Sequence, residues 1–140
     1  MNTNEIPVRP AGKPEARPRC EEAHAVIGCA FEVFNELGPG LDEKLYENSL
    51  LVEFKRKGIA CGLQRKSEAP GQDDPDGASA PYLIAANKVV VEARCIDQIT
   101  DQERGRMMDC LRVTKLPVGL ILNFKRARLD WERFNANERG

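Results

Sequence analysis

The sequence lacks several features that would assign it to whole classes of protein. No apolar run approaches the roughly 18 residues that a membrane-spanning helix needs, and the first 20 residues lack the apolar core of a signal peptide. The five cysteines include no pair with the C-x-x-C spacing of a shared metal ion, and His24 is the only histidine. We therefore expect no membrane partner, no zinc site and a cytoplasmic location.

The chain also has little net charge. Lysine and arginine number 21 against 22 aspartate and glutamate, which gives a net charge of −1 at pH 7. Any binding of nucleic acid must therefore come from a local basic patch, because the molecule as a whole does not attract an anion. A length of 140 residues, 41% of them hydrophobic, suffices for one domain and is too short for two independent cores.

Composition divides the chain into a domain and its flanks. Residues 1–20 are rich in proline and show no periodicity, so we expect a disordered lead-in. Residues 21–135 carry the periodic segments of the domain, and residues 136–140 form a C-terminal tail. Within the domain, "RKSEAPGQDDPDGASAP" (65–81) offers nothing to bury and predicts a mobile loop.

Hydrophobic periodicity predicts the secondary structure of the domain. Helices are expected over three segments: 21–37, about 42–58 and about 100–115. Strands are expected at 59–64, twice within 82–96, and at 118–124. "KRARLDWERF" (125–134) is either a last strand or, as its mixed charge favours, a solvated amphipathic end segment. The order α-α-β-β-β-α-β(-β) predicts an α/β (α+β) domain, a sheet with helices packed on it.

A carboxylate inside an apolar strand is the sharpest local feature. In "VVVEARC", a charged Glu92 would cost several kcal/mol unless it is paired or binds a cation. Arg94 projects from the same face of the strand, because side chains alternate with a period of two. Spacing alone favours an ion pair between the two on a solvated face. The alternative is a site where acid and cation hold a divalent metal against a phosphate.

A second feature is the stretch "GPGLDEKLYENSL" (38–50), in which a Gly-Pro-Gly break runs into a predicted helix. Asp42 is a plausible N-cap. Glu43 lies three residues before Tyr46, so both side chains are expected on one face of the helix. As a first-turn acid, Glu43 would also interact favourably with the helix dipole.

With Gly40, Glu43 and Tyr46 in the three named places, this stretch resembles the motif of the GxxExxY family. The likeness extends through "IGCAFEVFNELGPGL", "NKVVVEARC" and "LRVTKLPVGLILNF", and covers roughly residues 22–124. That family resembles the PD-(D/E)XK nuclease superfamily. The resemblance implies a single restriction-endonuclease-like domain, a mixed β-sheet flanked by helices.

The resemblance also implies a set of site residues. In that superfamily a strand Asp and a strand Glu bind Mg²⁺, and a Lys two residues later stabilises charge on the phosphate. Glu92 matches the strand Glu, and Glu43 matches an acid on the first helices. Arg94 occupies the Lys position, where it can clamp a phosphate but cannot act as a base. The Asp position holds Tyr82, whose phenol is a poor Mg²⁺ ligand.

The remaining matches complete this hypothesis. Arg106 stands where the family tends to carry a Gln facing the metal. The implied catalytic residues are Glu43, Glu92 and Arg94, with Glu92 and Glu43 as metal ligands. The implied phosphate-binding residues are Arg94, Arg106 and Tyr46. Mg²⁺ is the implied cofactor, and the aspartates of the 65–81 loop (Asp73, Asp74 and Asp76) are open as substitute ligands.

Three functions remain open from the sequence. The altered Asp and Lys positions favour a nuclease-like protein that binds nucleic acid or a protein partner with little or no cleavage. A Mg²⁺-dependent nuclease using Glu43, Glu92 and Arg94 is the first alternative. A non-catalytic protein-interaction module is the second. DNA, RNA, a protein partner and a second copy of the chain are the candidate partners.

Overall fold

The computed structural model describes residues 20–64 and 81–137. The predicted order of elements is confirmed, and it includes the last strand: α1 (Glu21–Leu37), α2 (Glu43–Arg56), β1 (Cys61–Gln64), β2 (Tyr82–Ala85), β3 (Val89–Arg94), α3 (Asp101–Thr114), β4 (Val118–Asn123) and β5 (Asp130–Asn135). Predictions for residues 1–19, 65–80 and 138–140 lie outside the described residues. Among the described helices, none is long and apolar enough to cross a membrane.

The five strands form one mixed sheet in the order β1-β2-β3-β4-β5. Strands β3 and β4 are parallel, and the other neighbouring pairs are antiparallel. A parallel pair needs a crossover connection, which α3 supplies here. The carboxyl ends of β3 and β4 therefore lie at the same edge of the sheet, next to the loops that follow them.

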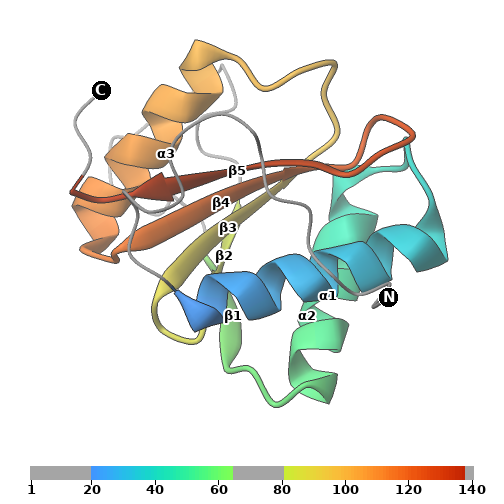
Figure 1. Ribbon diagram of the computed structural model, residues 1–140, viewed down its shortest axis with the longest axis horizontal. Coiled ribbons are helices and arrows are strands. Elements are labelled where there is room, and N and C mark those ends of the chain that lie inside the picture. Colours follow the sequence, from blue (N-terminus) through green and yellow to red (C-terminus); the bar gives the residue numbers. More distant parts are fainter. Residues whose placement is uncertain (1–19, 65–80, 138–140) are drawn as a thin grey trace.

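Helices cover both faces of the sheet (Figure 1): α1 and α2 pack on one face and α3 on the other. The alternation along β3 explains this. Val89, Val91 and Ala93 belong to the apolar cluster under α1 and α2, whereas Val90 belongs to the cluster under α3. Glu92 and Arg94 have the same parity as Val90, so they project toward the α3 face.

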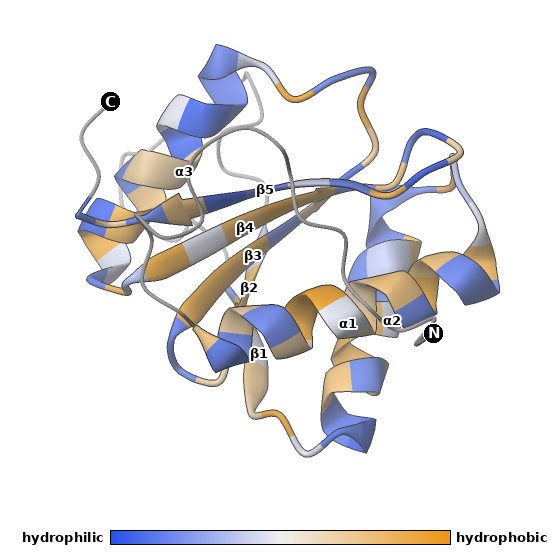
Figure 2. Ribbon diagram, viewed as in Figure 1, coloured by the Kyte–Doolittle hydropathy of each residue, from blue (hydrophilic) through white to orange (hydrophobic). Residues whose placement is uncertain are grey.

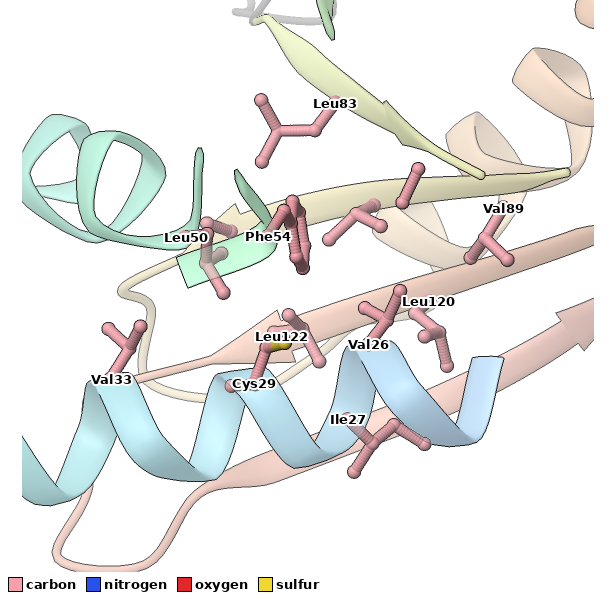
Figure 3. Packing of buried hydrophobic residues seen from close by; sticks show 14 of the residues in the cluster. Val26, Ile27, Cys29, Val33, Leu50, Phe54, Leu83, Val89, Leu120 and Leu122 are labelled. Carbon is pink, nitrogen blue, oxygen red and sulfur yellow. The ribbon is translucent and has the colours of Figure 1, made fainter. Parts of the chain in front are cut away.

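The two apolar clusters differ in size. Figure 3 shows the larger one, in which α1 and α2 close over the apolar side of the central strands, with Val26, Phe54, Leu83 and Leu120 among its members. In Figure 2 the hydrophobic colour follows these central strands and the helix faces that meet them. The cluster under α3 is smaller: Val90, Ile99, Met107, Cys110, Leu111 and Ile121. At the carboxyl end of β3, the α3 face of the sheet is therefore polar.

The interpretation of residues 125–134 as a solvated end segment is wrong. Strand β5 pairs with β4 along its length, from Val118 opposite Asn135 to Asn123 opposite Asp130. Of its two aromatic side chains, one packs against each apolar cluster. Within this segment, only the turn that precedes β5, residues 125–128, is exposed. The mixed charge of this segment did not indicate a strand, because an edge strand is held by backbone pairing, which needs no apolar pattern.

Candidate functional site

The connection between α1 and α2 is a glycine turn fixed to the end of β4. Gly38 and Gly40 have φ angles of 78° and 82°, which side chains with a Cβ rarely adopt. The Gly40 amide donates a hydrogen bond to the Phe124 carbonyl, with an N–O distance of 2.9 Å. The glycine turn therefore positions the start of α2 beside the loop that follows β4.

Tyr46 holds this turn from inside. Its side chain is fully buried, and its ring stacks on Phe124 with centroids 4.2 Å apart. Its hydroxyl donates to the Gly38 carbonyl at 2.6 Å and accepts from the Leu41 amide at 3.0 Å. The hydroxyl is thus engaged within the turn, which gives Tyr46 an architectural role. Its predicted contact with a phosphate stays a prediction.

Glu43 connects α2 to the end of β3. Asp42 caps the helix as predicted, since its side chain accepts from the Lys44 amide at 3.0 Å. Oε2 of Glu43 accepts from the Cys95 amide at 2.8 Å and from Nε of Arg94 at 3.3 Å. The helical acid of the motif therefore contacts the strand cation directly.

Arg94 has a second acidic partner, which lies on α3. Thr100 caps α3, since its hydroxyl accepts from the Glu103 amide, and this cap places Glu103 in the first turn of the helix. Nη1 of Arg94 lies 3.0 Å from Oε1 of Glu103. The Arg94 guanidinium is therefore held between an acid of α2, Glu43, and an acid of α3.

The expectation that Glu92 and Arg94 lie on a solvated face is wrong. Glu92 is only 8% exposed, and the Arg94 side chain is 16% exposed. Helix α3 covers this face of the sheet, so both groups lie in a partly buried polar layer between the strands and α3. Electrostatic interactions are stronger in such a layer than at the surface, because less water screens them.

Arg106 completes the set, one helical turn after Glu103. Its Nη1 lies 3.9 Å from Oε1 of Glu103, and its side chain is 15% exposed. Oε1 of Glu103 accepts no aligned hydrogen bond from the described residues, although the Arg94 and Arg106 guanidinium groups lie beside it. Glu103 was not among the predicted site residues, and its i, i+3 spacing to Arg106 is the one signal of this role in the sequence.

The described residues do not fit a Mg²⁺ site. Tyr82 comes directly before Leu83, which pairs with Val91, so it lies across from Glu92, where the superfamily's Asp is expected. In residues 20–64 and 81–137, no group of three His, Cys, Asp or Glu side chains is placed to hold a metal. Mg²⁺ needs near-octahedral oxygen ligands, whereas Arg94 already neutralises the acids nearest to it. The loop aspartates proposed as substitutes lie outside the described residues.

Comparison with known proteins gives one match. The family model for the PD-(D/E)XK nuclease superfamily matches residues 20–134, from the residue before α1 into β5. No curated protein and no solved structure matches the chain. The finer assignment to the GxxExxY family stays a prediction from the motif.

Proposed function

The chain belongs to the PD-(D/E)XK nuclease superfamily, and on this premise we propose that it binds nucleic acid with little or no cleavage. One observation carries the proposal: Arg94 is paired with Glu43 at 3.3 Å and with Glu103 at 3.0 Å. The protein itself, through Arg94, therefore supplies the positive charge that balances the two acids.

The chemistry of arginine explains why the chain would bind a nucleic acid without cleaving it. A guanidinium stays charged at any physiological pH, so Arg94 cannot take a proton from water. It presents five N–H donors in a fixed plane, which match the oxygens of a phosphate. The contacts of Arg94 with Glu43 and Glu103 use Nε and Nη1. Donors on Nη2 therefore remain for a phosphate oxygen.

Arg106 supports the same function. Its guanidinium and that of Arg94 both lie beside Oε1 of Glu103, at 3.9 and 3.0 Å, so the two cations share one place in the polar layer. A phosphate held by Arg94 could therefore gain a second charge-assisted contact from Arg106. We propose Arg94 and Arg106 as phosphate-binding residues, and Glu43 and Glu103 as the acids that position Arg94.

A cleavage and binding assay tests this function. The full chain is incubated with labelled single- and double-stranded DNA and RNA in Mg²⁺, Mn²⁺ or EDTA, beside the Glu92→Ala variant. We expect salt-sensitive binding and intact substrate under all three conditions. Metal-dependent cleavage that disappears in Glu92→Ala would show instead an active nuclease. Neither binding nor cleavage would favour the protein-interaction module.

A further inference from the structure

The turn between β4 and β5 carries a dense positive charge. Lys125, Arg126 and Arg128 are exposed within four consecutive residues. Figure 1 shows this turn at the end of the sheet where the α1–α2 connection also lies, and Figure 2 shows its hydrophilic character. We call residues 125–128 the basic turn. The role proposed for Arg94 and Arg106 does not use it.

The residue before the basic turn is hydrogen-bonded to the end of β3, the strand that carries Arg94. Immediately before the turn, the Phe124 amide donates to the Arg94 carbonyl at 2.8 Å. Asn123 is fully buried, and its side chain accepts from the Ile96 amide at 3.0 Å and donates to the Ile96 carbonyl at 2.8 Å. The turn therefore starts from a fixed point at the edge of the site.

The cations of the turn have different surroundings. Nε and Nη2 of Arg126 both donate to the Asp97 carbonyl, at 3.0 and 2.8 Å, so this residue fixes the turn to the loop after β3. Nζ of Lys125 lies 3.6 Å from Asp97 Oδ1, but this pair is exposed and therefore weak. Arg128 has no ion pair with any described residue. Lys125 and Arg128 are thus available to an anion.

We propose that the basic turn binds the phosphodiester backbone of a nucleic acid beside the Arg94 site, an inference that rests on the proposed function. The site alone contains three acids, Glu43, Glu92 and Glu103, against two arginines. It therefore offers no net positive charge to a polyanion, and the turn supplies the local cations that binding requires.

A nucleic acid fits this arrangement better than a lipid surface does. Arg94 and Arg106 are only 16% and 15% exposed, so a flat membrane would not reach them, whereas a flexible phosphate chain could follow from the turn into the site. The turn also has no large apolar side chain to insert into a bilayer, since alanine is its only apolar residue.

A pair of matched double variants tests the inference. Lys125→Gln with Arg128→Gln removes one lysine and one arginine from the turn and leaves the Arg126 clamp intact. The control, Lys55→Gln with Arg112→Gln, removes the same charges from exposed positions on α2 and α3. Lys55 lies 12 residues along α2 from Glu43, about 18 Å away at the helical rise. Within the described part of the chain, Arg112 is ion-paired only with the exposed Asp109.

Binding of a fluorescein-labelled oligonucleotide is measured by anisotropy over a range of salt concentrations, after circular dichroism confirms that both variants fold. The turn variant should bind about tenfold more weakly. Its slope of log K against log salt should be smaller by about 1.4–1.8 in magnitude, because each of the two lost phosphate contacts removes about 0.7–0.9. The control should stay within about twofold of the wild type.

The possible failures are distinguishable. If the wild type binds and the turn variant matches the control, the basic turn is not the contact, although the proposed function survives. Absence of oligonucleotide binding by the wild type would overturn both. Binding to phosphatidylserine vesicles without oligonucleotide binding would overturn the inference in favour of a lipid surface.

Discussion

Oε2 of Glu43 lies 3.3 Å from Nε of Arg94 and also accepts a hydrogen bond from the Cys95 amide. This contact joins the first turn of α2 to the carboxyl end of β3. The helix dipole accounts for an acid at this position in any helix, but the strand contact accounts for the length and geometry of glutamate. The motif residue therefore has a structural role that does not depend on catalysis.

Substitution of Glu43 should lower stability, and the loss should be larger when no oxygen acceptor remains. Glu43→Ala removes the acceptor of the Cys95 amide and one partner of Arg94, so we expect a loss of about 1–2 kcal/mol in the free energy of unfolding. Glu43→Gln keeps an oxygen acceptor and should lose less than half of that. Urea denaturation measures both. The control is Glu32→Ala, which removes an exposed glutamate of α1, and an equal loss there would contradict the assigned role.

Removal of Arg94 should cost more than removal of either of its acids. Arg94→Met leaves the carboxylates of Glu43 and Glu103 without their shared cation, and we expect a loss of about 2–4 kcal/mol. Adding Glu103→Gln to this variant should recover part of the loss, because one uncompensated charge is gone. A double-mutant cycle by urea denaturation gives the coupling. Purely additive effects would show that the pair contributes nothing.

A side chain at Gly119 should force Met107 to move, because α3 packs closely on β4 at this position. A Cβ added there would overlap Sδ of Met107, which is fully buried. We expect Gly119→Ala to lose about 1–3 kcal/mol through overpacking. In a Met107→Ala background, the same change should be neutral or stabilising.

Gly105→Ala is the matched control for this prediction. Gly105 is an exposed residue inside α3, and nothing lies within 4 Å of an added Cβ. Alanine should gain about 0.5–1 kcal/mol there, because it loses less backbone entropy on folding. Thermal unfolding compares the two substitutions, and a loss of similar size at both positions would contradict the packing argument.

Cys29 should make stability fall at alkaline pH. Burial, reinforced by the negative charge of Glu53, raises the pKa of its thiol from 9.0 to about 11. Between these two values the unfolded chain releases a proton that the folded chain retains, so the free energy of unfolding falls as pH rises. Cys29→Ala should flatten this slope, which is at most about 1.4 kcal/mol per pH unit. An unchanged slope between pH 9 and 11 in urea titrations would contradict the assignment.

Most of the fold could be predicted from the sequence, because each element has its own local signal. The α1 and α3 helices both follow from apolar residues at helical spacing. Strand β5 was the element that the sequence predicted least well. Its residues are only partly buried, apart from Asn135, and backbone pairing with β4 leaves no apolar alternation in the sequence.

The site was less predictable, because its contacts join residues far apart in the chain. Parity along β3 placed Glu92 and Arg94 on one face, and the structure agrees. Sequence spacing could not show that α3 covers that face, or that Glu103 pairs with Arg94. Those contacts depend on how α3 packs against the sheet, which no local pattern encodes.

The most direct test of the central claim is the affinity of the wild-type chain for an oligonucleotide in Mg²⁺ and in EDTA at equal ionic strength. If Arg94 and its neighbours hold the phosphate without a metal, affinity in EDTA should equal or slightly exceed that in Mg²⁺, because Mg²⁺ competes for the same phosphates. A tenfold or greater loss of affinity in EDTA would contradict the claim.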